Sequence, residues 1–303
     1  MMLGAYMRDL KLFLLYLLAV VVVGCLLAPL LYDAAQWLME AGYLTFLARF
    51  RFQKYLNRGI LIAALIFMPI FLMSLKMTSW KSLGIEKNVG KWRDLIMGFV
   101  FAALSLWLAA SVLLIEGQRV WKTNISWFNI GGALLTALTV ALIEEVFFRG
   151  VLLGVLRRHL SSYRALAILT VIFAALHFIR SPRTKVKIPE VEWHSGFTLL
   201  PKSFWQFSEP ELILGGLLTL CLVGWILGYT VIKTRSLFMA FGLHAGWVFA
   251  LRSFQFSTRK MGENNIWFGQ NLLTGLAPIL LLMLTGILLF FFFSRAESKR
   301  TAG

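Results

Sequence analysis

Charged residues are scarce in this chain. Only 15% of its 303 residues are Asp, Glu, Lys or Arg, whereas 59% are hydrophobic. Soluble globular domains carry about one quarter charged residues, so this composition excludes the soluble class. Acidic residues are scarcer than basic ones, with 14 Asp and Glu against 30 Lys and Arg, which gives a formal net charge of +16.

The excess of positive charge does not point to nucleic acid. The basic residues cluster between long apolar runs, where they fit loops that face anionic lipid headgroups. No basic patch with interleaved aromatic residues stands apart from these runs. We therefore expect membrane lipids as partners and no nucleic acid.

Cysteine pairs and simple metal motifs are also missing. Cys25 and Cys221 lie in different apolar runs, too far apart for a CxxC ligand pair, and we interpret both as packing residues. No HExxH pair, which would place two zinc ligands on one helix, occurs. Repeats and a dividing linker are absent as well, so we predict a single integral membrane domain over residues 1–303.

What the chain has in abundance is long apolar sequence. A membrane-spanning helix needs about 20 residues, and eight runs reach or approach this length. These runs lie near Leu12–Leu31, Ile60–Leu75, Leu95–Ile115, Phe128–Phe148, Leu166–Ile179, Leu212–Ile232, Leu237–Leu251 and Leu272–Phe293. The predicted fold is an all-α, polytopic transmembrane bundle of about eight spans. We expect a multi-pass protein of the bacterial inner (plasma) membrane.

One apolar run contains three charged residues. Glu144, Glu145 and Arg149 interrupt the stretch Leu142–Gly150. Charged side chains at membrane depth are costly and usually mark a functional site. On a helix Glu145 and Arg149 are i,i+4 neighbours and can pair, whereas Glu144 is turned about 100° away. We therefore predict a structural role for Glu145 and a chemical one for Glu144.

Two histidines lie inside other apolar runs. His177 closes the fifth run and His244 lies within the seventh. Imidazole can exchange a proton, bind a metal or donate to an oxyanion, and together with a carboxylate it can hold and activate water. A single intramembrane histidine can equally be a satisfied core residue, but two histidines and a diacid on three spans favour a site.

These segments resemble a known family. Glu144–Arg149 matches the EExxxR motif, and Phe173–His177 the FxxxH motif, of the CAAX-protease and bacteriocin-processing (CPBP, or Abi) intramembrane proteases, while Gly242–Trp247 resembles the approach to their third motif. The similarity covers roughly Leu142–Ala250, inside a predicted catalytic core of residues 128–252. It implies an intramembrane endopeptidase, with a membrane-associated peptide or protein substrate that is CAAX-type prenylated or of the bacteriocin type.

The resemblance also implies roles for individual residues. Glu144 would be the general base that activates water, His177 would position or polarise that water, and His244 would stabilise the oxyanion. Glu145 and Arg149 would brace the fourth helix. We favour a mechanism without metal; the alternative is Zn²⁺ held by Glu144, His177 and His244.

One position departs from the family pattern. The third motif is commonly HxxxN, but Val248 occupies the Asn position and cannot donate a hydrogen bond. Loss of one oxyanion donor can lower the rate about a hundredfold or more. Trp247 and Arg252 lie nearby without an assigned role. The alternatives are therefore a catalytically silent CPBP-like scaffold or immunity factor, and a secondary transporter with a proton relay.

Overall fold

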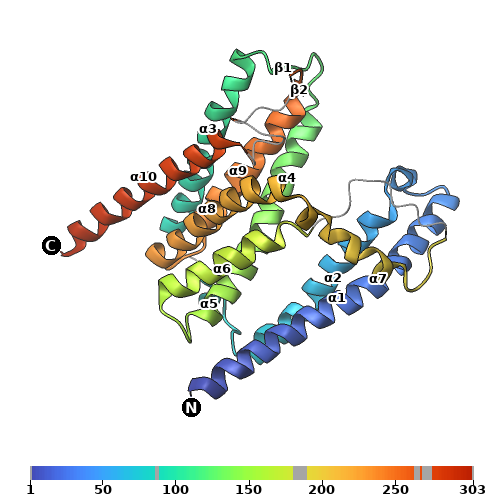
Figure 1. Cartoon of the computed structure of the whole chain (residues 1–303), viewed down its shortest axis with the longest axis horizontal. Coiled ribbons are helices and arrows are strands. Elements are labelled where there is room, and N and C mark those ends of the chain that lie inside the picture. Colours follow the sequence, from blue (N-terminus) through green and yellow to red (C-terminus); the bar gives the residue numbers. More distant parts are fainter. Residues whose placement is uncertain (1, 86–88, 180–189, 263–266, 268–274, 302–303) are drawn as a thin grey trace. The chain divides into compact units, whose positions relative to one another are not determined.

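The computed structural model describes residues 2–85, 89–179, 190–262, 267 and 275–301 (Figure 1). The chain divides into two compact units. The first unit comprises Met1–Thr78 and Leu176–Ile213, and the second comprises Ser79–Ala175 and Leu214–Gly303.

Helices make up most of the described chain, and the all-α prediction is confirmed. In lipid a spanning segment must satisfy its backbone hydrogen bonds internally, which a helix does. The helices are α1 (Met2–Glu40), α2 (Phe52–Ser74), α3 (Val89–Ile115), α4 (Trp127–Glu145), α5 (Leu153–Leu156), α6 (Ser162–Leu176), α7 (Ser195–Leu199), α8 (Pro210–Thr234), α9 (Phe238–Ser257) and α10 (Leu276–Thr301). Short 3₁₀ segments cover Thr45–Arg49, Trp80–Leu83 and Pro201–Ser208, a π-helical segment covers Val146–Leu152, and the strands are β1 (Arg119–Trp121) and β2 (Thr258–Lys260).

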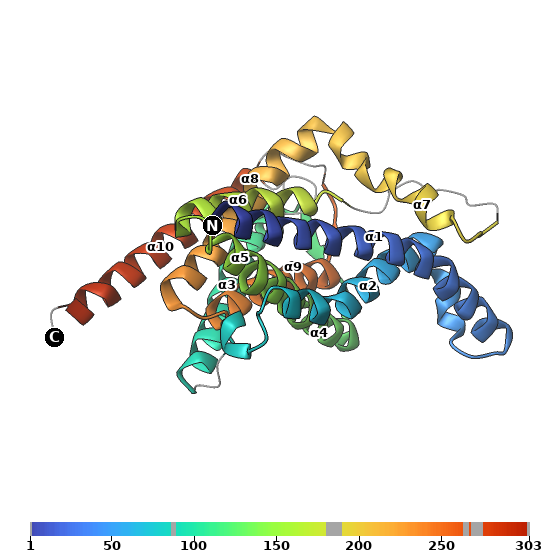
Figure 2. The same cartoon turned by 90° about the horizontal axis from the view of Figure 1, so that it is seen from below.

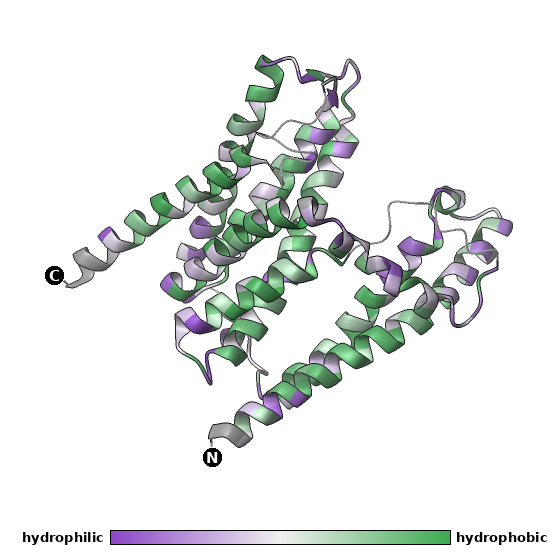
Figure 3. Ribbon diagram, in the orientation of Figure 1, coloured by the Kyte–Doolittle hydropathy of each residue, from purple (hydrophilic) through white to green (hydrophobic). Residues whose placement is uncertain are grey.

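Each of the eight apolar runs overlaps one of the α-helices named above. Within the described residues, six helical segments are long and apolar enough to cross a membrane: α1, α2, α3, α4 extended to Leu156, α8 and α10. The fifth run forms the shorter apolar helix α6 and the seventh forms α9; the first residues of the eighth run, 272–274, lie outside the described residues. Hydrophobic residues, coloured green in Figure 3, predominate along these helices. The protein is an integral membrane protein.

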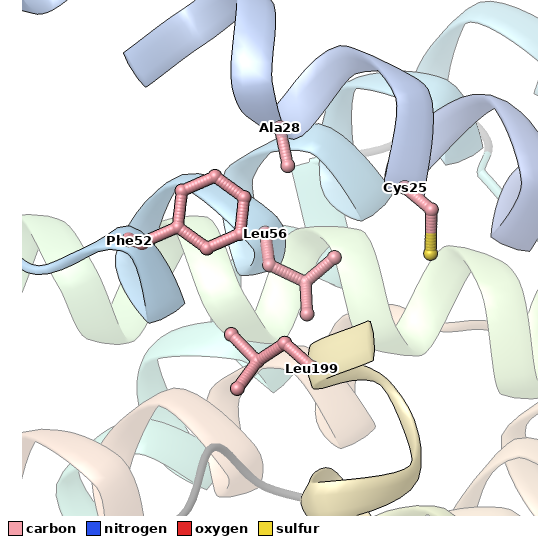
Figure 4. Packing of buried hydrophobic residues seen from close by; sticks show 5 residues of the cluster. All are labelled: Cys25, Ala28, Phe52, Leu56 and Leu199. Carbon is pink, nitrogen blue, oxygen red and sulfur yellow. The ribbon is translucent and has the colours of Figure 1, made fainter. Parts of the chain in front are cut away.

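The first unit is built on the pair α1 and α2, which lie side by side (Figure 1). Glycine permits this close approach: a Cβ on Gly24 would lie 2.7 Å from the Ile60 Cα, and one on Gly59 would overlap the Gly24 carbonyl. α7 contacts α1 and completes a small core (Figure 4). The buried members of this core are Cys25, Ala28, Phe52, Leu56 and Leu199.

In the second unit, α9 contacts both α3 and α4 (Figures 1 and 2). Gly242 and Gly246 face α3, because a Cβ on either would overlap a backbone carbonyl there, that of Leu95 or Phe99. His244 is two residues from each glycine, and each residue advances about 100° around a helix. It therefore projects from the opposite side of α9, away from α3.

A short antiparallel pair joins the ends of α3 and α9. β1 follows α3, β2 follows α9, and Val120 pairs with Arg259. Arg119 Nε donates to Thr258 Oγ1 at 2.8 Å, and the Trp121 ring stacks on Trp107 of α3. These contacts hold the two helices in register at this end.

Substitution of Gly242 tests the close approach of α9 and α3. We expect Gly242→Ala to lower the free energy of unfolding by about 1–3 kcal/mol, because the added methyl group would force the helices apart. Gly131→Ala in α4 is the matched control: a Cβ there meets nothing within 4 Å, so better helix propensity should make it neutral or mildly stabilising. Thermal unfolding in detergent measures both. Equal stability of the two variants would contradict the packing described here.

Candidate active site

A buried ion pair lies where α4 ends. Arg149 Nη1 is 2.8 Å from Glu145 Oε1, and both side chains are 0% exposed, so the predicted pair is confirmed. The predicted continuous span over Phe128–Phe148 is confirmed, since one helical segment covers Trp127–Leu156; within it the α-helical turns of α4 end at Glu145 and the π-helical segment carries Arg149. Such wide turns occur frequently at functional sites.

Arg149 connects three helices. Its Nη2 donates to the Gly224 carbonyl of α8 at 3.3 Å, and its Cζ lies 4.3 Å from the centre of the Phe173 ring of α6. Gly224 lies close to this ring, since a Cβ there would lie 3.2 Å from Phe173 Cδ1. The arginine therefore braces more than the one helix that the sequence predicted.

Glu145 has a second partner that the sequence did not predict. His244 Nδ1 lies 2.7 Å from Glu145 Oε1, the same oxygen that accepts from Arg149. An ionised carboxylate only accepts hydrogen bonds, so Nδ1 carries the hydrogen. This bond fixes the orientation of the imidazole.

The other ring nitrogen is directed at Glu144. His244 Nε2 lies 3.9 Å from Glu144 Oε2, which is too long for a direct hydrogen bond. Two polar groups more than 3.5 Å apart can be bridged by a water molecule. Glu144 is 27% exposed, whereas Glu145 is fully enclosed. The adjacent acids thus have different surroundings, because only the Glu144 side chain is partly exposed.

His177 directly follows α6 and belongs to the first unit. Glu144, Glu145, Arg149 and His244 all belong to the second unit. The distances given above do not involve His177, and its role stays a prediction. No group of three or more His, Cys, Asp or Glu that could hold a metal occurs among the described residues. In the second unit Glu144 and His244 supply two potential ligands, and the zinc alternative also stays a prediction.

An apolar pocket of the second unit is lined by sequence neighbours of Glu145 and His244. Its volume is about 340 Å³. Ala141, one helical turn before Glu145, and Ala245, the neighbour of His244, both line it. The lining residues are Ile85, Trp92, Leu95, Leu138, Ala141, Leu142, Phe238, Phe241 and Ala245. No sequence motif predicted this pocket, since its walls come from three separate segments of the chain.

The motifs and this geometry fall in one stretch of the chain. The family model described as type II CAAX prenyl endopeptidase Rce1-like matches residues 126–250. This segment is Rce1-like. The match confirms the resemblance to the CPBP proteases, and the Rce1-like segment contains Glu144, Glu145, Arg149, His177 and His244. The comparisons with curated proteins and with solved structures gave no match.

Proposed function

We propose that the protein is an intramembrane endopeptidase that hydrolyses a peptide bond of a membrane-associated, CAAX-type prenylated substrate. The observation that carries the proposal is the arrangement of His244, anchored through Nδ1 and facing Glu144 with Nε2 at 3.9 Å. It lies in the Rce1-like segment of an integral membrane protein. A carboxylate and an imidazole spaced in this way can hold a water molecule.

In the proposed reaction Glu144 removes a proton from water while the water oxygen attacks the carbonyl carbon of the scissile bond. The carbonyl π electrons move to oxygen and form an oxyanion. The C–N bond then breaks, and Glu144 returns the proton to the departing nitrogen. The net reaction adds OH from water to the acyl carbon and H to the amine. His177 would position the attacking water in the first step.

His244 stabilises the oxyanion in this scheme. Its Nδ1–H is held by Glu145, so Nε2 can donate only when the ring carries both protons. The negative charge of Glu145, 2.7 Å away, offsets the positive charge of that ring. Arg149 holds Glu145 in turn. The proposal therefore gives Glu145 a positioning role as well as a structural one.

The apolar pocket receives the prenyl chain in this proposal. Its lining is apolar and includes Ala141, four residues before Glu145, and Ala245, the residue after His244. We expect Leu138→Trp, which fills the pocket, to raise KM for a prenylated peptide about tenfold, equivalent to about 1.4 kcal/mol of binding, with kcat changed less than about twofold. Leu135→Trp is the control, because Leu135 is exposed on the same helix and does not line the pocket. Steady-state kinetics would contradict the assignment if the two variants behaved alike.

Cleavage by the purified protein tests the function. The protein in lipid nanodiscs is incubated with a prenylated CAAX peptide and its unprenylated counterpart, and products are identified by mass spectrometry. We expect cleavage of the prenylated peptide, incorporation of ¹⁸O from labelled water into the new carboxylate, and activity that survives strong chelators. Loss of activity on chelation would favour the zinc alternative.

Val248 is the observation that favours the second candidate function. Without a donor at this position the chain fits a silent membrane scaffold or immunity factor. A wild-type protein that binds the prenylated peptide but releases no product would support the scaffold and overturn the peptidase.

A further inference from the structure

Trp247 carries an unused hydrogen-bond donor. It lies on α9, three residues after His244, and only 8% of its surface is exposed. Its Nε1–H is buried and meets no hydrogen-bond acceptor among the described residues. The indole nitrogen can only donate.

A buried donor without an acceptor is costly. The penalty is about 1–3 kcal/mol, and native proteins retain few such groups without a functional reason. Trp107 shows the usual solution, since its Nε1 donates to Ser253 Oγ of α9 at 3.1 Å. Where α9 needs only aromatic bulk, a phenylalanine serves, as Phe249 does against Phe99.

The position of Trp247 relates it to the proposed reaction. Residues i and i+3 of a helix are neighbours, with Cβ atoms about 5–6 Å apart, so Trp247 lies next to His244 on α9. The i+4 neighbour of His244 is Val248, which has no donor. Of the two helical neighbours of His244, the Val248 side chain cannot donate a hydrogen bond to an oxyanion at Nε2, whereas Trp247 has a donor that no acceptor among the described residues uses.

We propose that Trp247 is a further catalytic residue, whose Nε1–H donates to the oxyanion together with His244 Nε2. This inference rests on the proposed peptidase function. Carbonyl oxygen becomes a stronger acceptor as negative charge develops on it, so the donor contributes more in the transition state than to binding of the substrate. The buried N–H gains its acceptor only when substrate is present.

The test removes the N–H and keeps the aromatic bulk. Trp247→Phe is expected to lower kcat for the prenylated peptide about 10²-fold, as for removal of one oxyanion donor, with KM changed less than about threefold. Adding Val248→Asn to Trp247→Phe places an amide donor at the other helical neighbour of His244 and should restore kcat at least about tenfold. Trp225→Phe, an exposed tryptophan of α8, is the matched control and should behave as the wild type.

A purely structural role for Trp247 makes a different prediction. It would lower the unfolding temperature of Trp247→Phe, and Val248→Asn would not restore activity; this outcome overturns the inference. If the phenylalanine variant does not fold, benzothienylalanine at position 247 replaces the N–H by sulfur at nearly constant shape, and the same loss of kcat is expected. Wild-type kcat in the benzothienylalanine variant overturns the inference about Trp247. The proposed peptidase function would still stand in that case if Glu144→Gln abolished cleavage. No cleavage by the wild type overturns both proposals.

Discussion

Glu144→Gln is expected to lower kcat for the prenylated peptide by about 10²–10⁴-fold, the contribution of a general base. The amide has the size of the carboxylate but cannot take a proton from water. Glu144 is partly exposed and lies outside the buried ion pair, so the variant should retain the unfolding temperature of the wild type. Initial rates in nanodiscs and thermal unfolding measure the two quantities.

Glu116→Gln is the matched control for this substitution. Glu116 is an exposed acid of the same unit and accepts a hydrogen bond from Gln118, far in sequence from the α4 motif. Its kcat should equal that of the wild type. Unchanged cleavage by Glu144→Gln would show that another group activates the water.

Glu145→Gln should instead destabilise the fold, by about 3–5 kcal/mol. Breaking a buried ion pair on one side leaves the other charge without compensation, and Arg149 is fully enclosed here. The same substitution removes the negative partner of His244 Nδ1. We expect loss of both stability and activity, measured by unfolding in detergent and by cleavage of the prenylated peptide.

A double substitution separates these two effects. Glu145→Leu combined with Arg149→Met removes both charges, and apolar replacement of a buried ion pair is often neutral or stabilising. The double variant should therefore recover stability relative to Glu145→Gln but not activity, because His244 Nδ1 still lacks its acceptor. Recovery of activity together with stability would show that Glu145 acts only through the fold. If Glu145→Gln were as stable as the wild type, this result would contradict a buried ion pair between Glu145 and Arg149.

The sequence by itself determined what depends on composition and on near neighbours along the chain. The scarcity of charge and the apolar runs determined a helical membrane protein, since lipid leaves the backbone few alternatives. The pair of Glu145 and Arg149 was predictable because i,i+4 residues meet on any helix. The different environments of Glu144 and Glu145 followed from the rotation per residue.

The tertiary structure alone decided which distant residues meet. His244 lies 99 residues after Glu145, and no periodicity of either segment indicates their contact. That contact depends on Gly242 and Gly246, which place α9 against α3 and leave His244 on the face toward α4. The unused donor of Trp247 is visible only where burial by neighbouring helices is known. Helical rotation is a local property of the backbone, whereas contacts between helices depend on the shapes of side chains from separate segments, and only the packed fold specifies them.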